Sequence, residues 1–171
     1  RLRLSSIEPW DVSPRLISLL RSKRVARHLH LPLQSGSAVT LRRMGRAISP
    51  AGYRALITRV RSEVPEIALT TDIIAGFPGE TEAEFQESIS FLQTMQFAGG
   101  HVFPYSARER TPAAAFQDPV PHPVRKARAS HIREILADSA ALYRKKFLGQ
   151  LLPVLWEDVQ ECDNGSCTVR G

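Results

Sequence analysis

An acidic residue lies inside an apolar run near the middle of the chain, and a glycine-rich turn follows it. Asp72 interrupts residues 67–75 (IALTTDIIA), and Gly76, Pro78 and Gly79 come directly after this run. A buried carboxylate needs a partner, so we expect Asp72 either to bind hydroxyl or ammonium groups of a ligand or to form a structural salt bridge. The turn matches neither common glycine pattern for phosphate binding, and its glycines are equally compatible with a simple tight turn.

Polar residues also follow the other apolar runs. Glu8 comes after the first run and Gln34 after the second, and together with Asp72 they offer two carboxylates and an amide. This set suits a ligand that carries hydroxyl, ammonium and carboxylate groups. Simpler alternatives exist, because Gln34 is also suited to capping the next helix and Glu8 to a turn. For His30 and His101 we expect ordinary packing.

These residues must be brought together by alternating strands and helices. Apolar runs predict strands at 1–7, 28–33, 67–75 and 99–105, and helical spacing predicts helices at 14–20, 37–44, 50–64, 81–95 and 124–148. Helices between consecutive strands indicate an α/β fold with a parallel sheet, either open or closed into a barrel. In both forms the carboxyl ends of the strands converge on one edge, where ligands bind. Residues 107–123 read as a loop, and 151–159 as a strand of a further domain.

Composition restricts the class of protein. The 171 residues are 43% hydrophobic and 23% charged, with a net charge of +6, which favours anionic partners such as nucleic acid or else forms a solvated basic surface. No apolar run is long enough for a membrane span. The chain begins at Arg1 without a signal-peptide pattern, so we expect a piece of a longer cytoplasmic protein. Cys162 and Cys167 are too few for a four-ligand metal site, and we expect free thiols.

Four stretches together resemble the methylthiotransferases of the radical S-adenosylmethionine (radical SAM) superfamily. They are HLHLPLQSGS (28–37), LRRMGR (41–46), TTDIIAGFPGETEAEF (70–85) and HVFPYSARERTPAA (101–114). The chain looks most like the branch acting on threonylcarbamoyladenosine in tRNA. The alternatives are the isopentenyladenosine branch, the branch acting on ribosomal protein S12, and a non-catalytic RNA-binding α/β domain. Ser35 occupies the place where the S12 branch usually has histidine.

The resemblance implies a partial parallel (β/α) barrel. Residues 1–149 would supply its last four βα units, and residues 150–171 would begin a small β-structured TRAM domain that binds RNA. The ligands of two [4Fe–4S] clusters would lie in a part of the parent that this chain lacks, so we expect the chain to be inactive alone. The parent would act as a monomer with an electron-donor protein.

The resemblance also implies a binding site for SAM. Glu8, Gln34, Arg46 and Asp72 match the family's SAM-binding positions, and Arg46 follows Gln34 by twelve residues. Arg46 would fork onto the methionine carboxylate. Asp72 and Gln34 would bind ribose hydroxyls, and Glu8 the ammonium group or ribose. The remaining expected contacts are Ser35, Gly76 as backbone lining, and Phe103 and Tyr105 against adenine.

The implied reaction inserts a methylthio group at C2 of adenosine 37 in the tRNA anticodon loop. SAM would serve both as methyl donor and as the source of a radical, and the protein would position and shield it. Lysine and arginine side chains would bind RNA phosphates, with a solvated helix face as the alternative. The residues expected to do so are Arg42, Arg43, Arg46, Arg125, Lys126, Arg128, Arg133, Arg144, Lys145 and Lys146.

Overall fold

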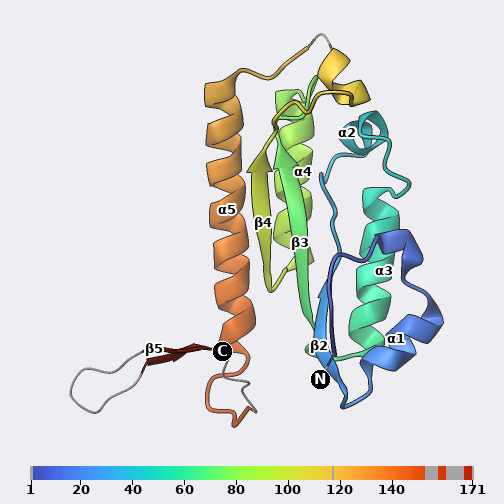
Figure 1. Cartoon of the computed structure of the whole chain (residues 1–171), viewed down its shortest axis with the longest axis vertical. Helices are drawn as coiled ribbons and strands as arrows, with labels where there is room; N and C mark the ends of the chain where they lie inside the picture. The colour runs from blue at the N-terminus through green and yellow to red at the C-terminus, as the bar shows by residue number, and fades with distance from the viewer. Residues whose placement is uncertain (1, 117, 153–157, 161–167, 171) are drawn as a thin grey trace.

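The fold is a four-stranded parallel sheet with helices packed on one face, which confirms the predicted α/β class (Figure 1). The computed structural model describes residues 2–116, 118–152, 158–160 and 168–170. The strands lie in sequence order and are β1 (Leu2–Leu4), β2 (Val25–His30), β3 (Ala68–Ala75) and β4 (Gly99–Pro104).

All five predicted helices form, and the side chains of Ser13, Ser49 and Thr81 cap three of them. They are α1 (Pro14–Leu20), α2 (Ala38–Arg43), α3 (Pro50–Glu63), α4 (Glu82–Met95) and α5 (His122–Lys145), with short 3-10 helices at Pro9–Asp11 and Pro112–Ala115. The predicted capping box of α4 is confirmed, because Thr81 Oγ1 accepts from the Glu84 N–H and the Glu84 carboxylate accepts from the Thr81 N–H. In the part of the chain that the structure describes, no helix is both long and apolar enough to cross a membrane.

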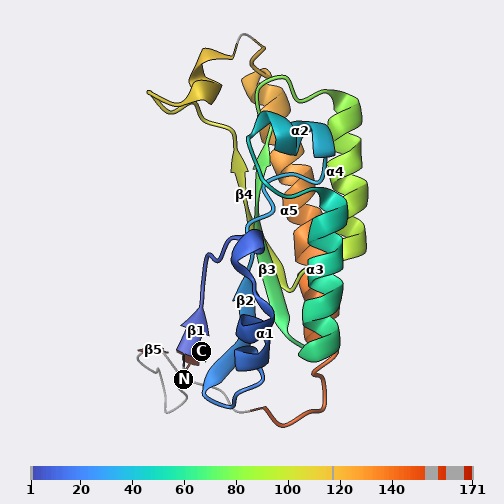
Figure 2. The same ribbon diagram turned by 90° about the vertical axis from the view of Figure 1, so that its right-hand side faces the viewer.

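The two faces of the sheet differ in what covers them. Helices α3, α4 and α5 lie on the same side, as Figure 2 shows, and the apolar core fills the space between them and the strands. In β3 the side chains alternate, so that Leu69, Thr71, Ile73 and Ala75 are buried and the intervening ones are half-buried. The half-buried side chains therefore share the face that no helix among the described residues covers.

Several predicted boundaries were wrong, among them the strand predicted at 1–7, which is only Leu2–Leu4. Strand β2 ends at His30 instead of continuing to residue 33, because Pro32 has no N–H to donate to a ladder. Leu31 still donates to the carbonyl of Thr70 at 2.9 Å, so the segment continues along β3 without forming a full strand. The predicted loop 107–123 contains the 3-10 helix Pro112–Ala115, and α5 begins before its end.

The carboxyl-terminal region is described in part. Strands β5 (Asp158–Gln160) and β6 (Thr168–Arg170) form an antiparallel pair. Most of the predicted strand 151–159, as well as Cys162 and Cys167, lies outside the described residues. The boundary at residue 150 and the TRAM domain therefore stay predictions.

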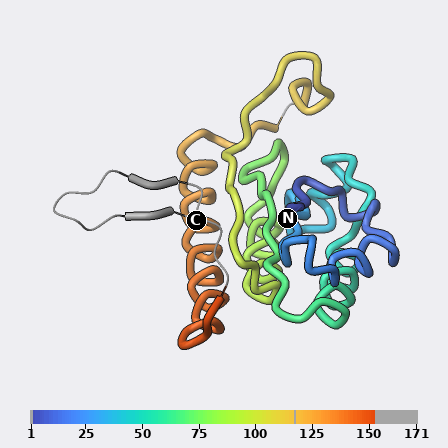
Figure 3. The backbone as a smooth tube through the Cα atoms, turned by 60° about the horizontal axis from the view of Figure 1, so that its bottom comes forward, coloured from blue at the N-terminus to red at the C-terminus, as the bar shows by residue number. Residues whose placement is uncertain are grey.

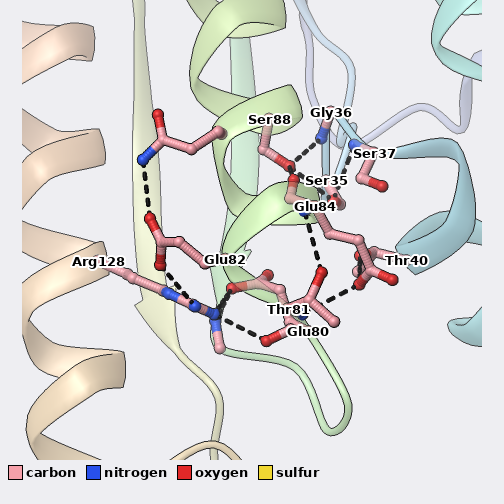
Figure 4. Close-up of polar contacts among 12 residues, drawn as sticks. Ser35, Gly36, Ser37, Thr40, Glu80, Thr81, Glu82, Glu84, Ser88 and Arg128 are labelled. Carbon is pink, nitrogen blue, oxygen red and sulfur yellow. Dashed lines mark hydrogen bonds and ion pairs between the residues drawn. The ribbon is translucent and has the colours of Figure 1, made fainter.

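The turn after β3 is fastened to α5 by a buried ion pair. Gly76 and Gly79 have φ angles of +72° and +73°, which suit glycine, and the Gly76 N–H donates to Glu80 Oε1 at 3.1 Å. Arg128 donates to the same oxygen at 2.7 Å and to the Glu80 carbonyl at 3.0 Å, and its other terminal nitrogen reaches Glu82 at 3.0 Å (Figure 4). The Glu80 side chain is only 2% exposed, so this turn serves packing against α5.

We expect Arg128→Met to lower the free energy of unfolding by roughly 3–5 kcal/mol, because it leaves the Glu80 carboxylate buried without its cation. Burial already raises the pKa of Glu80 and Arg128 opposes that shift. Without Arg128 the folded-state pKa rises further, so the loss should grow as the pH increases above about 4.5. Denaturant unfolding at several pH values measures both effects.

The matched control is Glu82→Gln, which weakens the contact of Arg128 with a side chain that is 67% exposed and that also accepts a hydrogen bond from Gln86. This control should cost less than about 1 kcal/mol. A loss of that small size in Arg128→Met would contradict a structural role for the buried pair.

Candidate functional site

A pocket lies at the carboxyl end of the sheet, where the sequence predicts ligand binding. Its volume is about 520 Å³. Four predicted site residues line it, namely Gln34, Asp72, Phe103 and Tyr105. The remaining lining comes from Ile74, Pro104, Ser106, Arg108, Thr111 and Ala113. The last four belong to the segment between β4 and α5, which projects from this end of the sheet (Figure 3).

Gln34 is held beside Asp72 by its backbone. Its N–H donates to the Asp72 carbonyl at 2.8 Å, and its own carbonyl accepts from the Ile74 N–H at 2.9 Å. The φ of Gln34 is +74°, in the left-handed region that side-chain-bearing residues rarely adopt. The N-cap of α2 is Ser37, so Gln34 does not cap that helix. Strained residues concentrate at binding sites, and this one lines the pocket.

Aromatic side chains form one wall of the pocket. The ring of Phe103 is 52% exposed. The ring of Tyr105 packs edge-on against Phe77, with centroids 5.3 Å apart, and its hydroxyl is buried without a hydrogen-bond partner among the described residues. A free aromatic face beside an unpartnered hydroxyl suits a planar heterocycle with ring nitrogens.

Asp72 contacts two histidines and also lines the pocket. One carboxylate oxygen lies 3.2 Å from His30 Nε2 and the other 3.2 Å from His101 Nδ1, while the side chain is 24% exposed and lines the pocket. The expectation of ordinary packing was wrong for His101, whose side chain is 74% exposed. Nothing among the described residues forms a cluster of three or more His, Cys, Asp or Glu able to hold a metal ion.

Glu8 and Arg46 form a separate group. Arg46 makes a two-pronged ion pair with the Glu8 carboxylate, donates to the Pro32 carbonyl at 3.3 Å and stacks on the Trp10 ring at 4.8 Å. Neither Glu8 nor Arg46 lines the pocket that contains Asp72. The two groups are connected through the chain, because Pro32 lies two residues before Gln34.

Ser35 and Gly76 face other parts of the fold. The Ser35 hydroxyl is buried and lies 3.1 Å from that of Ser88 on α4 (Figure 4). A side chain at Gly76 would collide with Arg125 of α5, since an added Cβ would lie 2.3 Å from Arg125 Cγ. Neither residue lines the pocket, and their expected contacts with a ligand stay predictions.

Sequence reasoning missed the loop residues of the pocket. Ser106, Arg108 and Thr111 line it, although they belong to a segment that has no periodic pattern. The stretch 101–114 contains them and is one of the four that resemble the methylthiotransferases. That resemblance is the one signal in the sequence that points to them.

Half of the basic residues expected to bind RNA contact the protein instead. Arg43 pairs with Glu84, and Arg125 and Arg133 donate to backbone carbonyls of Tyr105 and Val102. Arg46 and Arg128 form the ion pairs described above. Arg133 is nevertheless exposed, as are the remaining five, Arg42, Lys126, Arg144, Lys145 and Lys146.

Comparisons with known proteins agree with this architecture. Coproporphyrinogen III oxidase from Escherichia coli, described as a radical SAM enzyme, has a similar fold with a TM-score of 0.65, although only 16% of residues are identical. The match covers 80% of this chain and 32% of that protein.

Curated relatives carry a more specific name. A tRNA-2-methylthio-N(6)-dimethylallyladenosine synthase from Geobacillus kaustophilus is 39% identical over 158 residues, which cover 92% of this chain and 30% of that protein. The protein of the same name from Acetivibrio thermocellus is 38% identical over 171 residues, 99% of this chain and 36% of that protein. The chain thus spans about a third of these relatives.

These names correct one prediction. They refer to dimethylallyladenosine, so the assignment to the threonylcarbamoyladenosine branch is not supported and the alternative isopentenyl-type branch is the better one. The sequence model described as the radical SAM superfamily matches residues 1–92. Because this match includes more than half of the chain, the chain belongs to the radical SAM superfamily.

Proposed function

We propose that this chain forms the SAM-binding part of a tRNA methylthiotransferase that modifies dimethylallyladenosine-type nucleosides. Membership of the radical SAM superfamily and the names of the relatives support this reaction class. The observation that carries the proposal is the pocket in which Gln34, Asp72, Phe103 and Tyr105 converge at the carboxyl end of the sheet.

The pocket residues fit the nucleoside part of SAM. The Asp72 carboxylate accepts hydrogen bonds from ribose hydroxyls, and the Gln34 amide accepts from them or donates to them. The exposed side chain of Phe103 stacks on adenine, and Tyr105 lines the same pocket beside it. Each group is presented by a strand end or by a backbone-paired residue, so its orientation is set before the ligand arrives.

The ion pair between Glu8 and Arg46 supports this pocket indirectly, through the segment that leads to Gln34. Arg46 already binds both carboxylate oxygens of Glu8 and the Pro32 carbonyl. We therefore assign it to holding the segment from Pro32 to Gln34, in place of the direct contact with the methionine carboxylate that the resemblance implies. Its Nε, which is buried without a partner among the described residues, is left as a donor for a carbonyl or a ligand.

SAM bound next to a [4Fe–4S] cluster would supply the radical chemistry, and the cluster ligands would come from outside these residues. The chain's own task is then to bind the nucleoside, orient it and keep water from it. Phe103 and the loop with Arg108 and Thr111 line the same pocket, which places hydrophobic and basic groups around the ligand.

RNA would approach this edge of the sheet. Arg108 lines the pocket, and Arg110 is exposed two residues later. The exposed Lys145 and Lys146 lie at the opposite end of α5 from this loop (Figure 1). We therefore assign the phosphate contacts to Arg108 and Arg110 of the loop, in preference to Lys145 and Lys146 at the far end of α5.

Asp72→Asn should weaken SAM binding by roughly ten- to a hundredfold, because it removes a charge-assisted hydrogen bond at the ribose. Isothermal titration calorimetry measures the change. The matched control is Asp138→Asn, which makes the same chemical change on an exposed residue of α5 and should leave the affinity unaltered. Equal affinities for SAM in all three proteins would overturn the assignment of the pocket.

Replacing Arg108 and Arg110 with glutamine should reduce the affinity for an anticodon stem-loop and its dependence on salt. Each lost phosphate contact lowers the slope of log affinity against log salt by about 0.7 to 0.9. The control pair is Lys145→Gln with Lys146→Gln, which removes the same charge at the far end of α5. A lower slope in the lysine pair alone would show that RNA binds the helix instead.

A further inference from the structure

A line of hydrogen bonds runs along the uncovered face of the sheet toward Asp72. At its start, Arg3 Nε on β1 donates to His28 Nδ1 on β2 at 3.4 Å. His28 Nε2 lies 3.1 Å from Thr70 Oγ1 on β3. These side chains line a second cavity of about 480 Å³ on this face.

The line continues from Thr70 to the pocket. Thr70 Oγ1 lies 3.0 Å from His30 Nδ1, and the opposite ring nitrogen of His30 contacts Asp72. Asp72 is also contacted by His101 from β4, its direct neighbour in the strand register. Asp72 thus stands between the two cavities, with a histidine on each side.

The direction of hydrogen-bond donation along the whole line follows from the residues at its two ends. Arginine only donates, so His28 Nδ1 must accept and its proton lies on Nε2. That N–H donates to Thr70 Oγ1. The single hydroxyl proton of Thr70 is then donated to His30 Nδ1. His30 therefore carries its proton on Nε2 and donates it to Asp72, which as a carboxylate only accepts. Every donor meets an acceptor only when His28 and His30 are neutral.

We infer that this line from Arg3 to Asp72 is a directional relay that holds the Asp72 carboxylate oriented toward the cofactor pocket. His30 and His101 are its positioning residues, and Thr70 is the link that transmits the orientation from β2. The part of this inference that concerns SAM rests on the proposed function, whereas the hydrogen-bond order rests on the contacts alone.

The positive charge at the start of the line favours a neutral His28. The groups that face it are Arg3 on β1, Asp72 on β3 and His101 on β4. Burial, with a smaller contribution from the Arg3 guanidinium, lowers the pKa of His28 from its usual 6.5. A proton on His28 Nδ1 would point at the Arg3 donor, and a proton on His30 Nδ1 would leave the hydroxyl of Thr70 without an acceptor in the line.

Nitrogen NMR of the histidine rings tests the relay without any cofactor. The chain has five histidines, and two of them, His122 and His131, belong to α5 and serve as internal references. At pH 7.5 we expect long-range ¹H–¹⁵N spectra to show His28 and His30 each in a single tautomer with the proton on Nε2. A proton on Nδ1 of either ring, or a mixture of both forms, would overturn the relay.

Two substitutions of Thr70 isolate the link. Thr70→Val keeps the shape but removes the hydroxyl, so His30 Nδ1 should lose its hydrogen bond and its ¹⁵N signal should shift, and SAM should bind roughly two- to tenfold more weakly. Thr70→Ser retains the hydroxyl and should restore both. The control Thr94→Val removes a hydroxyl that bonds only within α4, to the Phe91 carbonyl, and should change neither.

The outcomes separate this inference from the proposed function. Fixed tautomers in a chain that does not bind SAM would refute the cofactor assignment and leave the relay standing. SAM binding with unfixed tautomers, or a Thr70→Val variant whose His30 signals are unchanged, would refute the relay alone.

Discussion

The parallel pairing of β3 with β2 and β4 sets the position of the pocket side chains that come from the sheet. A central strand gives alternate side chains to its two faces, and in β3 the buried set packs on the helices while Thr70, Asp72 and Ile74 take the other face. The register with β4 puts His101 next to Asp72, and the register with β2 puts His30 next to Thr70. A shift of one residue would turn Asp72 into the apolar core, where its charge would be unpaired.

The same strand also fixes the loop that follows β2. Pro32 stops the regular ladder, and Gln34 returns to β3 through two backbone hydrogen bonds in a left-handed conformation. The strain of that conformation is offset by the two bonds and by the ion pair of Arg46, which holds the Pro32 carbonyl. This arrangement explains how residues 38 positions apart meet: Glu8 pairs with Arg46 beside the loop, and Gln34 bonds to Asp72 in the pocket.

Charges divide between stability and function in a way that their types do not reveal. Arg128 and Glu80 are buried together and hold the turn after β3 against α5. Part of the positive charge of this basic helix therefore lies inside the protein. Arg108 is exposed on the loop before α5 and lines the pocket. The positive charge of the chain is therefore compatible with RNA binding, but its location is decided by which arginines find a carboxylate on folding.

The sequence by itself determined the α/β class, the order of strands and helices, the capping box at Thr81 and Glu84, and the presence of Gln34, Asp72, Phe103 and Tyr105 at strand ends. These follow from periodicity, capping chemistry and the convergence of parallel strand ends, which are local or topological rules. Tertiary structure alone decided that Glu8 pairs with Arg46 away from the pocket, that Ser35 faces α4, and that two histidines bracket Asp72. Those outcomes depend on strand register and on distances between side chains far apart in the chain, and neither quantity is encoded in the spacing of residues along a single strand.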